Sequence, residues 1–212
     1  MKRRDALTPG EYYHIFNRGI EKRRIFYKNT DYQRFINNLT LFNTNKPSWL
    51  VHDMNEAGID FCPDEDERLI DLVAYCVNPN HFHLLVRENQ ENGIAIFMKK
   101  ICTGYAMYFN KKNERTGILF QGRFKSVHIE SNDLLLYISA YVNCNSEIHG
   151  IEKASQYKWC SFSEYLNNRN ESCQKVIVLD QFKNAANYGD FCYDKIVDMK
   201  KKKELESEIF EN

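Results

Sequence analysis

The stretch Cys76-Val77-Asn78-Pro79-Asn80-His81-Phe82-His83-Leu84-Leu85-Val86 places two histidines one residue apart. Asn78-Pro79-Asn80 is turn chemistry between two apolar runs, which predicts a β-hairpin with strands over residues 69–77 and 81–87. Alternate side chains of a strand share a face, so His81 and His83 are predicted to point the same way. Imidazole is the commonest metal-ligating side chain, which makes the pair a candidate metal site. The alternative is one packed, hydrogen-bonded histidine beside an exposed one.

Helix and strand patterns flank this hairpin on both sides. Before it, alternation predicts a strand over residues 12–17, and apolar spacing predicts a helix from cap residues 29–31 to about 42. After it come a helix over residues 94–111, a strand over 124–129 and a helix over 134–143. The order strand, helix, strand, strand, helix, strand predicts an α+β fold. This is the ferredoxin-like split βαβ pattern with a central antiparallel sheet, plus one added helix.

The length of 212 residues suits one substantial domain. We expect this domain over residues 8–170, with an acidic, poorly periodic insertion at about 47–68 that lies at the surface. Residues 171–212 are expected to be a C-terminal extension, partly helical or frayed.

The sequence also indicates a compartment. No stretch approaches the roughly 18 apolar residues of a membrane span, and no apolar signal core follows the first residues, so we expect a cytoplasmic protein without a membrane partner. The seven cysteines are odd in number and include no Cys-x-x-Cys pair. Reduced thiols are therefore predicted in place of a zinc knuckle or a disulfide framework.

Charge is balanced overall but uneven along the chain. Lys and Arg number 29, as do Asp and Glu, which gives a net charge of zero. Cations concentrate in residues 1–30 and 99–125, whereas acids concentrate in residues 53–71. The two basic segments are interleaved with aromatic residues and could form one basic face for a single-stranded nucleic acid. Solvated helix faces and core aromatics are the alternative.

The added helix supplies further chemistry. Tyr141 and Asn145 are four residues apart, so they project from one helix face if the helix extends that far. A phenol and a carboxamide brought near two imidazoles supply a nucleophile and a third metal ligand. Tyr105, Tyr108 and Tyr137 are rival tyrosines.

Several motifs in a fixed order now resemble a known family, the REP-associated tyrosine transposases within the HUH superfamily of single-stranded DNA endonucleases. The matching segments are His14-Ile15-Phe16-Asn17-Arg18-Gly19, residues 75–85, Phe120-Gln121-Gly122-Arg123-Phe124-Lys125-Ser126, Tyr141-Val142-Asn143-Cys144-Asn145 and, downstream, Trp159-Cys160-Ser161-Phe162. The resemblance implies that His81 and His83 bind a divalent metal with Asn145, and that Tyr141 is the nucleophile. Where the family commonly has Asn-Pro, this chain has Asn145-Ser146.

The resemblance also implies the reaction and its partners. Two neutral imidazoles, an amide oxygen and open positions suit Mg²⁺ or Mn²⁺. The expected activity is nicking and strand transfer on single-stranded or hairpin DNA through a 5′-phosphotyrosine intermediate, by a monomer or homodimer. Candidate DNA-binding residues are Arg18, Lys22, Arg23, Arg24, Gln121, Arg123 and Lys125.

Two alternatives remain open. One is a domesticated DNA-binding module on the same fold without transposition activity. The other is a His-x-His metalloenzyme acting on a small molecule, which would need a third strong ligand, with His128 as the histidine to examine.

Overall fold

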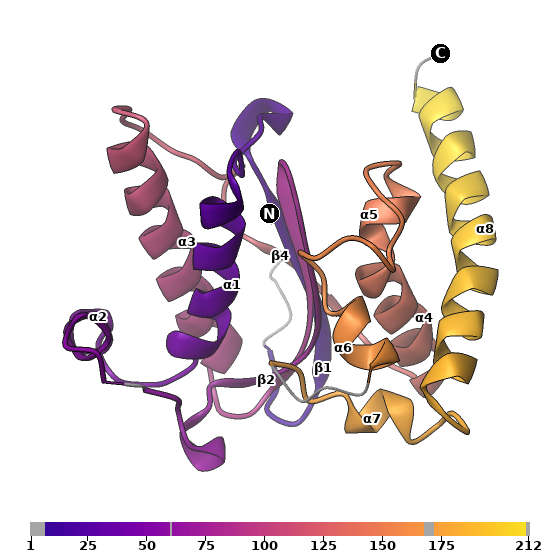
Figure 1. Ribbon diagram of the computed structural model, residues 1–212, viewed down its shortest axis with the longest axis horizontal. Helices are drawn as coiled ribbons and strands as arrows, with labels where there is room; N and C mark the ends of the chain where they lie inside the picture. Colours follow the sequence, from indigo (N-terminus) through magenta and orange to yellow (C-terminus); the bar gives the residue numbers. More distant parts are fainter. Residues whose placement is uncertain (1–6, 60, 168–171, 211–212) are drawn as a thin grey trace. The chain divides into compact units, whose positions relative to one another are not determined.

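The structure is a computed structural model that describes residues 7–59, 61–167 and 172–210 (Figure 1). The start of the first basic segment, before residue 7, lies outside these ranges. Four strands form one sheet in the order β2-β3-β1-β4. They are β1 (Tyr12–Arg18), β2 (Ile70–Asn78), β3 (His81–Glu88) and β4 (Lys125–His128).

Two helices lie between these strands in the sequence. α1 (Asn29–Leu41) precedes β2, and α3 (Gly93–Lys112) precedes β4. The predicted α+β split βαβ order and the central antiparallel sheet are therefore confirmed. The predicted added helix is α4 (Asn132–Asn143), which begins after Ser131, whose hydroxyl accepts the Leu134 N–H.

The acidic insertion contains regular structure that the sequence pattern did not predict. α2 (Ser48–Glu56) follows Pro47, and a 3₁₀ turn covers Glu65–Glu67. The buried residue of α2 is Val51, while Trp49 is 65% exposed. A single buried position gives no helical period to detect, which is why this helix was missed.

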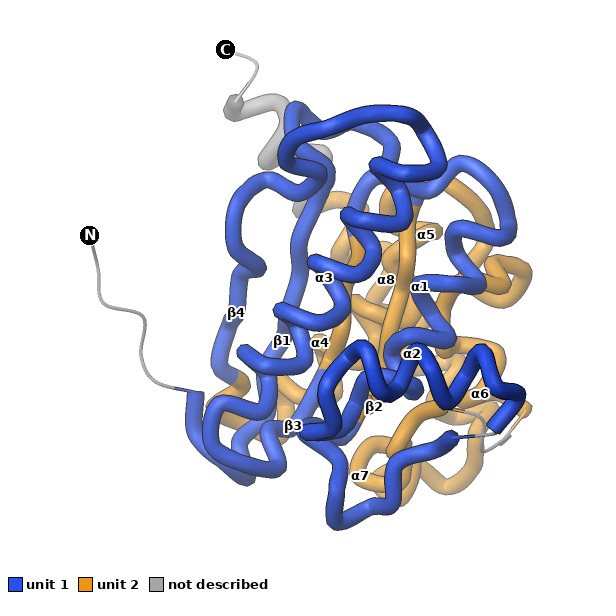
Figure 2. The backbone as a smooth tube through the Cα atoms, turned by 90° about the vertical axis from the view of Figure 1, so that its left-hand side faces the viewer, with its two compact units in different colours: residues 1–71, 79–81, 86–128 blue, residues 72–78, 82–85, 129–212 orange. Residues whose placement is uncertain are grey.

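The chain is divided into two compact units, coloured separately in Figure 2. Unit 1 is Met1–Asp71, Pro79–His81 and Val86–His128, and unit 2 is Leu72–Asn78, Phe82–Leu85 and Ile129–Asn212.

Unit 1 is built around aromatic packing between α1 and α3, which lie side by side in Figure 1. The ring of Phe26 packs 5.2 Å from Phe35 and 4.8 Å from Tyr105. Asp31, in the first turn of α1, accepts hydrogen bonds from the Tyr27 and Lys28 backbone N–H groups. It also accepts from the Tyr108 hydroxyl and Lys112, both on α3, so one buried carboxylate fixes the two helices together.

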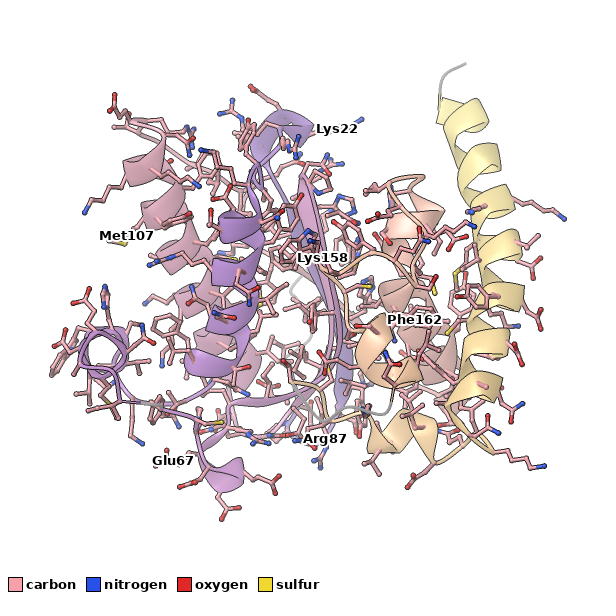
Figure 3. The ribbon with its side chains drawn as sticks, in the orientation of Figure 1. Lys22, Glu67, Arg87, Met107, Lys158 and Phe162 are labelled. Atoms are coloured by element: carbon pink, nitrogen blue, oxygen red, sulfur yellow. The ribbon has the colours of Figure 1, made fainter. Side chains whose placement is uncertain are left out.

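Unit 2 holds α4 against the C-terminal helices. These are α5 (Asn145–Ile148), α6 (Phe162–Leu166), α7 (Val176–Leu179) and α8 (Ala185–Phe210). Phe162, labelled in Figure 3, is completely buried and its ring lies 6.4 Å from Tyr188 of α8. Residues 159–161 run antiparallel to β2, with Val77 N–H donating to Trp159 O and Ser161 N–H to Tyr75 O. This segment is the downstream motif to which the sequence assigned no role.

No helix in the described ranges has both the length and the apolar character needed to cross a membrane. The seven cysteines, all within those ranges, are free thiols.

Candidate functional site

Tyr141 lies in the last turn of α4, where its ring meets the imidazole of His83. The two ring centroids are 5.4 Å apart, and the planes cross at 89° in an edge-to-face contact. His83 is 7% exposed, whereas Tyr141 is half-buried. Strand β3 and helix α4 thus bring the predicted nucleophile and one predicted metal ligand together within unit 2.

Asn145 begins α5, directly after the tyrosine helix. Helix α4 ends at Asn143, and Cys144, with φ −102° and ψ 11°, separates it from α5. The side chain of Asn145 is completely buried, and its Oδ1 accepts a hydrogen bond from Asn78 Nδ2 at 2.6 Å. Asn78 ends β2, immediately before the hairpin turn. The amide of Asn145 is therefore held by the strand that leads to the two histidines.

A buried polar network holds α4 in place. Asn143 Oδ1 accepts from the Ser161 hydroxyl at 2.6 Å, and Asn143 Nδ2 donates to the Tyr188 hydroxyl at 2.8 Å. The Tyr188 hydroxyl in turn donates to Ser139 Oγ at 3.2 Å. The network ties the helix that carries Tyr141 to α8 and to the 159–161 segment.

His81 begins β3 and belongs to unit 1. Its Nδ1 lies 2.6 Å from Asn80 Oδ1, and Asn80 Nδ2 donates to the Lys22 carbonyl at 3.0 Å. An amide oxygen only accepts hydrogen bonds, so a hydrogen bond at this contact requires the proton on Nδ1 of His81. A neutral imidazole with its proton on Nδ1 ligates a cation through Nε2.

The predicted donors, His81, His83 and Asn145, are of the nitrogen and amide-oxygen types that divalent cations accept. In the part of the chain that the structure describes, no three His, Cys, Asp or Glu side chains gather into a metal-binding group. His128, the alternative ligand, stands on β4 with Nε2 2.9 Å from Glu11 Oε2. His14, on β1, is 7% exposed, and burial lowers its pKa to about 4.

The predicted DNA-binding residues come from two segments that meet beside β1. Strands β1 and β4 are antiparallel, with Phe16 opposite Lys125. Arg18 Nε donates to Gln121 Oε1, and the Gln121 N–H donates to the Arg18 carbonyl at 2.8 Å. Arg123 and Lys125 are exposed in the same segment. Four of the candidates, Arg18, Gln121, Arg123 and Lys125, therefore lie at one end of the β1–β4 ladder.

The other three candidates occupy the turn after β1, where Figure 3 labels Lys22. Lys22 is exposed. Arg23 pairs with Glu21 at 3.1 Å, and Arg24 Nε donates to the Phe26 carbonyl at 2.7 Å. Both guanidinium groups thus already make contacts that support the turn.

Two rival tyrosines have structural roles. The buried Tyr105 hydroxyl donates to the Ile25 carbonyl at 2.6 Å, and Tyr108 bonds Asp31. Sequence reasoning treated Asn78 and Asn80 only as turn residues and missed that they hold Asn145 and His81. The signal in the sequence that could have revealed such a role was an amide residue directly beside a candidate metal ligand.

Comparisons with known proteins agree with this architecture. The family described as "Transposase IS200 like" matches residues 10–145. A solved structure of the REP-associated tyrosine transposase bound to a REP hairpin is 14% identical, with a TM-score of 0.53, over 79% of this chain and 86% of that one. A chain from Deinococcus radiodurans, described as a transposase, is also 14% identical, with a TM-score of 0.37, over 72% of this chain and 99% of that one. No curated protein matches.

The first of these structures shares the fold, whereas the family match covers most of the chain and includes both histidines, Tyr141 and Asn145. The chain therefore belongs to the IS200-like transposase family.

Proposed function

We propose that this transposase nicks and rejoins single-stranded DNA with Tyr141 as its nucleophile. The observation that supports this most is the edge-to-face contact between Tyr141 and His83. It places a half-buried phenol beside one of two imidazoles on alternate positions of a strand.

His81, His83 and Asn145 would hold a divalent metal, Mg²⁺ or Mn²⁺. Two imidazole nitrogens and one amide oxygen leave further positions for oxygen ligands. When bound, the cation polarises the scissile phosphate and offsets its negative charge. The chain's own part is to orient the individual donors. Asn80 orients His81, and Asn78 holds the amide of Asn145.

Tyr141 then performs the covalent step. Its Oη attacks phosphorus, so an O–P bond forms to the DNA 5′-phosphate while the bond to the 3′-oxygen breaks. The phenolic proton is lost to solvent, and the departing 3′-oxygen takes up a proton. Attack by another 3′-hydroxyl reverses the step and restores the tyrosine, so strands are rejoined without ATP.

The DNA is proposed to be single-stranded and to carry an imperfect palindrome folded as a hairpin. The supporting observation is the basic end of the β1–β4 ladder, Arg18, Gln121, Arg123 and Lys125, together with Lys22 in the adjacent turn. Cations there would contact phosphates.

The test is incubation of the protein with a labelled library of single-stranded hairpins and Mg²⁺ or Mn²⁺, followed by recovery of covalent adducts and sequencing of the junctions. We expect adducts that require the metal and share one cleavage position. Hairpin binding without any adduct would instead identify a domesticated binding module, and would overturn the proposed activity.

A further inference from the structure

The hairpin turn before His81 is held by the segment that follows β1. Gly19 N–H donates to the Asn80 carbonyl at 2.8 Å. The N–H groups of Ile25 and Phe26 both donate to the Pro79 carbonyl, at 2.8 and 3.0 Å. These backbone contacts fix the position of Asn80 within unit 1 independently of its side chain.

The Asn80 side chain then links that segment to the histidine. The Lys22 carbonyl can only accept a hydrogen bond, so it selects Nδ2 of Asn80, at 3.0 Å. Oδ1 of the same amide therefore faces Nδ1 of His81, at 2.6 Å. The contacts from Lys22 through Asn80 therefore place a hydrogen-bond acceptor at Nδ1 of His81.

The Lys22 carbonyl, which accepts from Asn80, belongs to a constrained stretch of backbone. Glu21 and Lys22 are consecutive non-glycine residues in the left-handed region, with φ of 56° and 57°. Such residues persist only where surrounding contacts determine them. Gly19 also has no room for a side chain, because a Cβ there would lie 2.4 Å from the Arg23 carbonyl. The turn thus presents the Lys22 carbonyl at a defined place.

We propose that Asn80 is a positioning residue that fixes His81 as the Nδ1–H tautomer, the form that would ligate a metal through Nε2. The metal part of this inference rests on the proposed function, whereas the tautomer part does not. Without an acceptor at Nδ1, the hydrogen bond that favours the proton on that nitrogen is lost. When a metal-ligating histidine loses the hydrogen bond at its other ring nitrogen, metal affinity falls by about 10- to 100-fold.

The first test reads the tautomer directly by ¹⁵N–¹H NMR of the metal-free full chain with labelled histidine. The spectra are recorded at about pH 8.5, roughly two units above the ordinary imidazole pKa of about 6.5, where an imidazole of ordinary pKa is neutral. His81→Gln assigns the His81 signals. The wild type is expected to carry the proton on Nδ1, and Asn80→Ala to show a mixture of tautomers. Asn80→Asp keeps an acceptor for Nδ1 and is expected to keep the Nδ1–H form, even though it cannot donate to Lys22.

The second test measures Mn²⁺ affinity by electron paramagnetic resonance. Asn80→Ala should bind Mn²⁺ about tenfold more weakly or worse, whereas Asn80→Asp should stay closer to the wild type. The matched control is Asn37→Ala, an exposed amide on α1 whose side chain bonds Gln33, and it should match the wild type.

A wild-type proton on Nε2, or an Asn80→Ala tautomer identical to the wild type, would overturn the proposal. If circular dichroism shows that Asn80→Ala is poorly folded, the wild type and Asn80→Asp still test the proposal. An Nε2–H form of His81 in either protein would contradict it. Absence of Mn²⁺ binding by a wild type in the Nδ1–H form would remove the metal from the proposed function but leave the positioning of His81 intact.

Discussion

Replacing Asn143 with alanine should destabilise the protein, because this side chain joins three elements of unit 2. It accepts from Ser161 at 2.6 Å and donates to Tyr188 at 2.8 Å, and it is completely buried. Two buried hydrogen bonds contribute about 1 to 1.5 kcal/mol each, so their loss costs about 2 to 3 kcal/mol. Ser161 retains its bond from the Tyr75 N–H, which limits any further penalty.

The assay is urea unfolding followed by far-ultraviolet circular dichroism, with the free energy of unfolding extrapolated to water. Asn167→Ala is the control, because Asn167 is an exposed amide of the same unit that donates to the Ser163 carbonyl. It should change the free energy by less than about 0.5 kcal/mol. If Asn143→Ala unfolds at the same urea concentration as the control, the network does not stabilise α4 and the reasoning is wrong.

Three further results are expected. Burial lowers the pKa of His14 to about 4, below its ordinary value near 6.5. Between these two pH values the unfolded chain binds more protons than the folded chain. The free energy of unfolding therefore falls as the pH drops through this window. Urea titrations should show that the free energy of unfolding falls by about 2 kcal/mol from pH 7 to 5. If a His14→Gln protein shows the same pH dependence, His14 is not the cause. Burial raises the pKa of Asp31, but hydrogen bonds from Lys112, Lys28, Tyr108 and Tyr27 outweigh it and lower that pKa. Asp31→Ala should therefore lose about 3 kcal/mol of unfolding free energy, and equality with the exposed Asp53→Ala in the same titration would refute this role. Arg123→Ala should weaken hairpin binding in fluorescence anisotropy and reduce the slope of log affinity against log salt by about 1, whereas an unchanged slope would show that Arg123 contacts no phosphate.

The fold could be predicted because its strands and helices carry local periodicity. The alternation around His81 and the helical stripe through Ile94 and Phe97 gave boundaries within one or two residues of β3 and α3. The antiparallel pairing of residues 159–161 with β2 carries no such local signal, because it joins Cys76 to a residue far along the chain.

The sequence indicated candidate reacting residues but not the side chains that contact them. The two histidines stood out through residue type and spacing, whereas the family resemblance distinguished Tyr141 from the rival tyrosines. The role of Asn78 depends on Asn145, 67 residues away, and that of Asn80 on Lys22, 58 residues away. Such partners are set by tertiary packing, so the two amides looked like ordinary turn residues.

The central claim is that Tyr141 becomes covalently joined to DNA. The most direct measurement is mass spectrometry of peptides from adducts formed on one selected hairpin with Mn²⁺, compared among the wild type, Tyr141→Phe and Tyr137→Phe. Tyr137 lies one turn earlier on the same helix and is the matched control. We predict a nucleotide on the Tyr141 peptide of the wild type and of Tyr137→Phe, and no adduct with Tyr141→Phe although hairpin binding survives. An adduct on Tyr137, or one that persists in Tyr141→Phe, would contradict the account.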